Sequence, residues 1–143
     1  MDVRALVVDD SGIMRKMVMR SLKETELAEF TFVEAEDGVD ALQKFDPDEI
    51  DMVFADWNMP NMTGIELVRM IRETCEDIPI VMITTESTMA KVEEALDSAG
   101  ADGYVVKPFT PDVLTKKLTP LFERMAAGGD SKGFFGKLAS KFS

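Results

Sequence analysis

A single α/β domain, built as a five-stranded parallel sheet doubly wound by five helices, is the fold that the sequence predicts. Short apolar runs rich in β-branched residues alternate with longer stretches of helical period, and the alternation repeats five times. Strict alternation predicts parallel strands, because parallel neighbours need right-handed crossover connections that carry helices over the faces of the sheet. At 143 residues, 45% of them hydrophobic, the chain is long enough for one full core and too short for two.

The strands are predicted from apolar runs that end in polar or turn-forming residues. Two of the runs, which contain "MVFA" and "VMI", show no alternation and are expected to be buried on both faces of the sheet. The predicted strands are residues 4–10 ("RALVVDD"), 30–36 ("FTFVEAE"), 50–56 ("IDMVFAD"), 78–85 ("IPIVMITT") and 103–108 ("GYVVKP").

The first helix is predicted to follow Ser11, whose hydroxyl is a suitable N-cap. Ile13, Met17 and Leu22 are expected on its apolar face, and the helix is expected to end near Glu26.

The last helix is predicted to open at Thr110, with Pro111 in the first helical position, where its missing N–H costs no hydrogen bond. The remaining helices follow from the same period. They are expected at residues 38–46, 63–74 and 87–99, and the last helix at 110–127.

The composition excludes several classes of function. A formal net charge of −11 argues against nonspecific binding of nucleic acid, whose phosphates would be repelled. The absence of histidine excludes histidine-based triads, histidine metal ligands and self-phosphorylation on histidine. A single cysteine, Cys75, permits no internal disulfide, and the sequence shows neither a signal peptide nor an apolar run of the roughly 18 residues that span a bilayer. We therefore expect a soluble, cytoplasmic protein.

Four of the predicted strands end in polar side chains at the edge where such sheets bind ligands. Three carboxylates at one edge would repel one another unless a cation neutralised them, and oxygen ligands without nitrogen or sulfur favour Mg²⁺. A lysine and a hydroxyl beside the metal would suit a phosphoryl group. The sequence therefore predicts that Asp56 accepts phosphate as an aspartyl phosphate. The residues concerned are Asp9 and Asp10 at the end of the first strand, Asp56 at the end of the third, Thr84 and Thr85 at the end of the fourth and Lys107 at the end of the fifth.

Each of these residues also has an ordinary interpretation. Asp10, just before Ser11, could be a turn former or helix cap, Thr84 could continue a strand, and Lys107 could be a solvated lysine. The functional interpretation is favoured because four different strand ends each carry a residue type that a phosphorylated metal site requires.

Four motifs carry a resemblance to a known family. The stretches "VVDDS", "EAEDGVDAL", "DWNMPNMTGIEL" and "GADGYVVKPFT" occur in this order. With them, residues 1–127 resemble the receiver domain of bacterial two-component response regulators, most of all the single-domain chemotaxis regulators of the CheY type, which have a flavodoxin-like fold. The resemblance implies that this range is a receiver (response regulatory) domain.

The resemblance also implies the metal site. By that similarity Asp56 is the phosphoacceptor, and Mg²⁺ is bound by Asp9, Asp10, Asp56 and the backbone carbonyl of Asn58. Trp57, beside the acceptor, would report metal and phosphoryl binding by its fluorescence.

Further roles are implied for residues around the acceptor. Thr84 and Lys107 would contact the phosphoryl group, and Tyr104 would be an aromatic switch that packs inward after phosphorylation. Asn58 lies two positions after Asp56, and Glu86 lies two positions after Thr84. Both would tune the rate of dephosphorylation.

The implied function is a phosphorylation-driven switch. The phosphoryl group would come from a partner histidine kinase of the CheA type, because a chain without histidine cannot be its own histidine kinase. Charge added at Asp56 would rearrange the face formed by residues 87–127, which would then bind a motility output protein such as the flagellar motor switch. A phosphatase is a further expected partner. We expect a monomer that is no enzyme beyond phosphotransfer to, and hydrolysis from, Asp56.

Two alternatives stay open. A phosphate sink or phosphorelay intermediate would share every site residue and differ in its partners and in the lifetime of the phosphoryl group. A haloacid-dehalogenase-like phosphatase also forms an aspartyl phosphate with Mg²⁺. That class needs a second carboxylate two residues after the nucleophile, and here that position is Asn58.

Residues 128–143 depart from the family pattern and are expected to form a linker followed by a basic amphipathic segment. Three lysines against Asp130 give residues 130–143 a net charge of +2. The segment could be a frayed end, or it could dock in a partner's groove, on the chain's own output face or, least favoured, on a membrane. The predicted docking residues, which share one helical face, are Phe134, Phe135, Leu138 and Phe142.

Overall fold

The predicted parallel sheet is present in the computed structural model, which describes residues 1–127. All neighbouring strands are parallel, and their order across the sheet is β2-β1-β3-β4-β5. The docking residues predicted between 128 and 143 lie outside the described residues. The strands are β1 (Asp2–Val8), β2 (Glu29–Ala35), β3 (Met52–Ala55), β4 (Ile80–Thr84) and β5 (Gly103–Val106).

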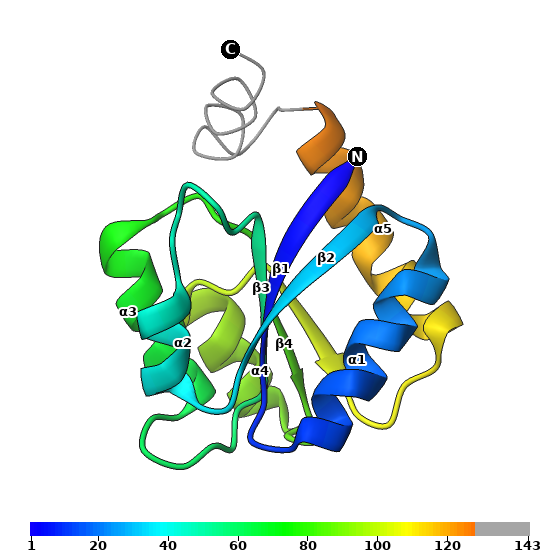
Figure 1. The fold of residues 1–143 in the computed structure, drawn as a ribbon. Coiled ribbons are helices and arrows are strands. Elements are labelled where there is room, and N and C mark those ends of the chain that lie inside the picture. Colours follow the sequence, from blue (N-terminus) through cyan, green and yellow to red (C-terminus); the bar gives the residue numbers. More distant parts are fainter. Residues whose placement is uncertain (128–143) are drawn as a thin grey trace.

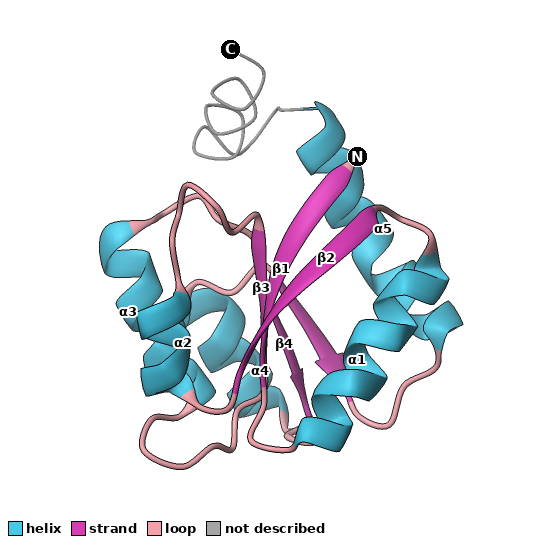
Figure 2. Cartoon of the chain, in the orientation of Figure 1, coloured by secondary structure: helices cyan, strands magenta, loops and turns pink. Residues whose placement is uncertain are grey.

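Helices cover both faces of this sheet, as predicted for a doubly wound fold (Figure 1). One layer holds α1 and α5, which pack against each other, and the other holds α2, α3 and α4. Figure 2 shows the loops that leave the carboxyl ends of the strands together, at the bottom of the view. The helices are α1 (Gly12–Thr25), α2 (Gly38–Lys44), α3 (Gly64–Thr74), α4 (Met89–Glu93), which continues as the π-helical segment η1 (Glu94–Ala99), and α5 (Pro111–Ala127).

Two helix starts follow the predicted capping. The Ser11 hydroxyl accepts a hydrogen bond from Met14 N–H, so this residue is the N-cap of α1. Pro111 is the first residue of α5, and the Thr110 hydroxyl accepts from Val113 N–H at 3.2 Å.

Within residues 1–127, no helix combines the length and apolar character needed to span a bilayer.

The apolar face predicted for α1 is wrong in part. Leu22 is fully buried, as expected, but Ile13 is 76% exposed and Met17 is 54% exposed. The second buried residue of the helix is Val18, which is five positions after Ile13 and therefore about 140° around the helix from it. The helix thus turns a different stripe toward α5 and the sheet.

The segment predicted as one helix over 87–99 changes its hydrogen-bond pattern partway. Thr88 caps α4, which gives way to η1 at Glu94, and the segment ends at Gly100 with a left-handed φ of +96°. Single π-helical turns occur often at functional sites.

The core forms one cluster on each side of the sheet. The cluster under α2, α3 and η1 includes Leu67, Ile71 and Met82, and the cluster under α1 and α5 includes Leu22 and Leu118. All residues of β3 and β4 are buried, which confirms the prediction that these strands are covered on both faces.

Candidate functional site

Three carboxylates converge at the carboxyl edge of the sheet. β1 ends at Val8, so Asp9 and Asp10 lie in the loop that follows it, and Asp56 follows β3 in the same way. One carboxylate oxygen of each lies within 4.8 Å of the others. Asp9 is buried, Asp56 is half-buried and Asp10 is exposed. This is the donor set that the sequence predicted for a divalent cation.

Lys107 lies among these carboxylates. Its ammonium is 2.8 Å from Asp9 Oδ2 and 3.6 Å from Asp56 Oδ2. The residue follows β5 directly and is only 9% exposed, so the interpretation as a solvated lysine is wrong. A buried cation held by two carboxylates offsets part of their mutual repulsion.

The environment of Asp56 combines burial with hydrogen bonding. Its Oδ1 accepts a hydrogen bond from Trp57 N–H at 2.8 Å. Burial raises the pKa of Asp56, while a hydrogen bond from Thr84 and the positive charge of Lys107 oppose the rise. A cation next to these carboxylates would favour the ionised, nucleophilic form.

The loop between β3 and α3 is fixed by a close backbone approach. Gly64 N–H donates to the carbonyl of Trp57 at 2.8 Å, and a Cβ at Gly64 would collide with the backbone oxygen of Asp56. Farther along, Asn61 adopts a left-handed φ of 68°, and its side chain donates to Asp37 Oδ2 at 2.9 Å. These contacts hold the loop that contains Asn58.

Asp9 is oriented by its own loop and by Arg15. Asp9 Oδ1 accepts from Ser11 N–H at 2.9 Å. Arg15 donates from Nη1 to the Asp9 carbonyl at 2.6 Å and pairs through Nε with Glu34 at 2.9 Å. Sequence reasoning missed Arg15, because nothing in the pattern tells which side of α1 faces the end of β1.

The hydroxyl and aromatic residues of the site meet at Glu86. Glu86 N–H donates to Thr84 Oγ1 at 3.3 Å, its carbonyl accepts from the Tyr104 hydroxyl at 2.7 Å, and its side chain accepts from Asn58 Nδ2 at 2.9 Å. Thr84 is fully buried, whereas Thr85, at the same strand end, is exposed and takes no part.

Tyr104, the predicted switch residue, is already buried at 9% exposure in this structure. Burial, together with the negative charges of Glu86 and Asp56, raises the pKa of Tyr104 to about 12.

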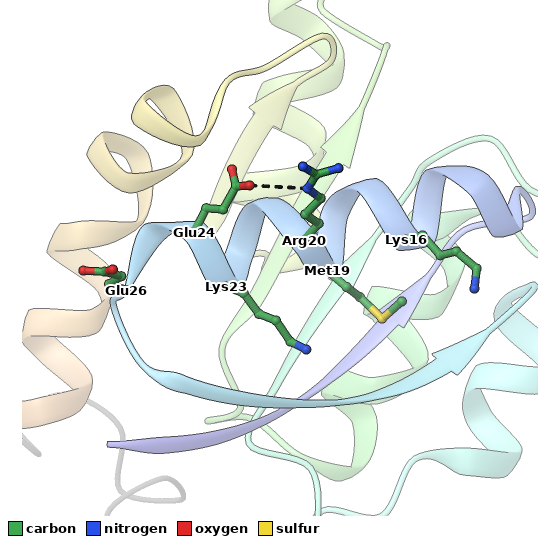
Figure 3. Close-up of a pocket in the computed structure, with 6 residues that line it drawn as sticks. All are labelled: Lys16, Met19, Arg20, Lys23, Glu24 and Glu26. Atoms are coloured by element: carbon green, nitrogen blue, oxygen red, sulfur yellow. Dashed lines mark hydrogen bonds and ion pairs between the residues drawn. The ribbon is translucent and has the colours of Figure 1, made fainter.

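A separate hollow lies along α1 and does not involve the strand ends (Figure 3). Three basic residues, Lys16, Arg20 and Lys23, line it together with Met19 and two glutamates, Glu24 and Glu26. Arg20 pairs with Glu24 at 3.4 Å.

The sheet order and the cluster of Asp9, Asp56 and Lys107 are the features expected of a response regulator receiver domain. The model of the response regulator receiver domain matches residues 5–119, and the chain belongs to that family. Within the family the chain is similar to chemotaxis proteins. It is 45% identical, over 119 residues, to the chemotaxis protein CheY homolog of Campylobacter jejuni (strain 81-176), which covers 81% of this chain and 89% of that protein.

Solved structures agree with this assignment. The chemotaxis response regulator CheY4 of Vibrio cholerae is 36% identical with a TM-score of 0.74, covering 85% of this chain and 99% of that one. The CheY chain in a CheX-CheY-BeF3-Mg complex from Borrelia burgdorferi is 27% identical with a TM-score of 0.76, covering 84% and 89%.

Proposed function

We propose that this protein is a phosphorylation-activated response regulator of a two-component chemotaxis or motility system, and that Asp56 is its phosphoacceptor. The observation that carries the proposal is the arrangement of Asp9, Asp10 and Asp56 within 4.8 Å, with the buried Lys107 between two of them. The aspartate in this group whose carboxylate also has a hydroxyl partner, Thr84, is Asp56.

The proposed reaction is the transfer of a phosphoryl group from a partner histidine kinase of the CheA type. A carboxylate oxygen of Asp56 attacks the phosphorus, the phosphorus–nitrogen bond of the kinase phosphohistidine breaks, and the imidazole nitrogen keeps the electron pair. The ammonium of Lys107 and the hydroxyl of Thr84 would then compensate the negative charge on the oxygens of the bound phosphoryl group. Hydrolysis of the aspartyl phosphate, tuned by Asn58 and Glu86, returns the carboxylate, so the chain acts as a switch and not as an ordinary enzyme.

The residues present fit Mg²⁺, because all the donors are oxygen atoms. Asp9, Asp10, Asp56 and the carbonyl of Asn58 would hold the ion, which, when bound, supplies positive charge to the transferring phosphoryl group. The similar CheY chain from Borrelia burgdorferi was solved in a complex with CheX, BeF3 and Mg²⁺.

The output of the switch is proposed to be the face of α4, β5 and α5. Glu86 links Thr84 to Tyr104, and Tyr104 lies on β5. A phosphoryl group that draws Thr84 and Lys107 toward Asp56 would therefore act on the loop before α4 and on the end of β5. A bias of a few kcal/mol between two states suffices for such a switch.

The partners we propose are a CheA-like kinase, a motility output protein such as the flagellar motor switch, and a phosphatase. The phosphatase is supported by the similarity to a CheY that was solved in complex with CheX. Neither nucleic acid nor a membrane is proposed as a partner, and we propose a cytoplasmic monomer whose receiver domain is residues 1–127. A phosphate sink is the second candidate, since it would use the same site.

The experiment that tests the proposal follows Trp57 fluorescence in the full chain while Mg²⁺ and then acetyl phosphate are added. Quenching by acetyl phosphate that is lost in Asp56→Asn would support the proposal. A response that persists in Asp56→Asn would contradict it. A phosphoryl lifetime too short to alter binding of any motility protein would favour the phosphate sink.

A further inference from the structure

A contact between Lys91 and Trp57 joins α4 to the residue that follows the acceptor. The Lys91 ammonium lies 4.4 Å from the centroid of the Trp57 ring, and Trp57 is only 6% exposed. Among residues 1–127, Lys91 takes part in no ion pair, so the indole face is the partner of its charge there. A cation over the face of tryptophan is the strongest form of cation–π contact.

Trp57 is in turn connected to the acceptor through its backbone. Its N–H donates to Asp56 Oδ1 at 2.8 Å, and its carbonyl accepts from Gly64 N–H at 2.8 Å. We therefore expect the peptide group that orients the Asp56 carboxylate to be restrained from α3 by Gly64 and, through the indole, from α4 by Lys91.

The short helix α4 has few other attachments to the body of the protein. None of its residues is buried, Met89 is 76% exposed, and Val92 is its contribution to the hydrophobic cluster below. Just before the helix, the hydrogen bond from Asn58 to Glu86 joins the loop after β3 to the loop after β4. The anchored part of this segment is η1, where Ala95 and Ala99 are buried, so α4 itself is weakly attached and responds readily to a change in any one of its contacts.

We propose that Lys91 is a positioning residue for the phosphoacceptor. By holding the indole, Lys91 keeps Trp57 N–H directed at Asp56 and couples α4 to the acceptor loop. The coupling is reciprocal, so a protein bound to α4 would shift the equilibrium between unphosphorylated and phosphorylated Asp56 by the factor with which phosphorylation alters that protein's affinity. The part of this inference that concerns phosphorylation rests on the proposed function.

The chain offers a matched set of variants. Lys91→Met keeps a long apolar side chain and removes the charge, whereas Lys91→Arg keeps the charge. Lys23→Met makes the same change of charge at another cation–π contact. Lys23 lies on α1 (Figure 3), and its ammonium is 5.8 Å from the Phe32 ring centroid.

The first measurement is amide hydrogen exchange of the full chain without phosphodonor. Exchange at Trp57 and in α4 should be about two- to five-fold faster in Lys91→Met, and unchanged in Lys91→Arg and Lys23→Met. Exchange at the wild-type rate in Lys91→Met, or the same acceleration in Lys23→Met, would overturn the proposal.

The second measurement is the rate at which acetyl phosphate phosphorylates these variants with Mg²⁺ in excess. Lys91→Met should be slower by a similar factor, and Lys91→Arg should restore the rate. A wild-type rate in Lys91→Met despite faster exchange at Trp57 would refute the positioning role. If the wild-type chain took up no phosphoryl group, the proposed function would fail, while the exchange measurement would still decide whether Lys91 holds Trp57.

Discussion

The ammonium of Lys107 lies 2.8 Å from Asp9 Oδ2 and 3.6 Å from Asp56 Oδ2, so a single buried lysine bridges the carboxylates that follow β1 and β3. These residues are distant in the sequence and meet because β1, β3, β4 and β5 are parallel and end at the same edge of the sheet. The lysine compensates negative charge before any ligand binds. It also lies where an added phosphoryl group would need a positive partner.

Replacing Lys107 should destabilise the folded protein, because the acidic cluster then lacks its positive charge. In Lys107→Met the buried Asp9 loses its charged partner, and we expect the free energy of unfolding to fall by about 3 kcal/mol. Urea unfolding measures the loss, and added Mg²⁺ should recover part of it by taking over the compensation. Lys16→Met, which removes an exposed lysine, is the control and should change stability by about 0.5 kcal/mol or less. Equal stability of the two variants would contradict the role assigned to Lys107.

Because the backbone of Asp56 lies so close to Gly64, we expect position 64 to tolerate no side chain. A methyl group at Gly64 would meet the Asp56 backbone, so we expect Gly64→Ala to lower the free energy of unfolding by about 1–3 kcal/mol. Gly103→Ala is the matched control, because its Cβ would meet Val81 only at an ordinary 3.5 Å. Urea unfolding of both variants would show no difference if the acceptor loop could move aside freely.

The phenol of Tyr104 should titrate well above its usual range. Because Tyr104 is the only tyrosine, the ultraviolet absorbance of tyrosinate reports this residue alone, and the midpoint is expected at a pKa of about 12. The unfolded chain releases the proton near the ordinary value of 10.0, so stability should decline as the pH rises from there to the folded pKa. Tyr104→Phe should remove this part of the decline. A midpoint near 10 in the folded protein would show that the hydroxyl is not buried against Glu86.

The docking interpretation of residues 130–143, made from the sequence, predicts a loss of partner affinity when the apolar residues of this segment are changed. Replacing both Phe134 and Phe135 by alanine should weaken binding to the kinase or to the motility output protein about tenfold or more. Isothermal titration calorimetry measures the affinity, with Ser140→Ala as the control. Unchanged affinity for every partner tested would favour the interpretation of this segment as a frayed end.

Much of the fold and the members of the candidate site could be predicted from the sequence, for a physical reason. Five apolar runs separated by helical periods allow few topologies, and parallel strands must bring Asp9, Asp56 and Lys107 to one edge. Strand alternation and helix capping are local, so the element boundaries lie within a few residues of those predicted.

Contacts that depend on how a helix is rotated could not be predicted in the same way. The stripe of α1 that faces the core is set by its packing on α5 and the sheet, which leaves Ile13 and Met17 exposed. Arg15 reaches the carbonyl of Asp9, and Lys91 reaches the ring of Trp57, only because of that tertiary placement. Neither contact has a signature in sequence spacing.

The measurement that tests the central claim most directly is the intact mass of the full chain after incubation with Mg²⁺ and acetyl phosphate, with the modified residue located by peptide mapping. We predict that one phosphoryl group is added, that it resides on Asp56, and that Asp56→Asn, Lys107→Met and omission of Mg²⁺ each abolish or greatly slow its addition. A phosphoryl group on another residue, or equal modification of Asp56→Asn, would contradict the account.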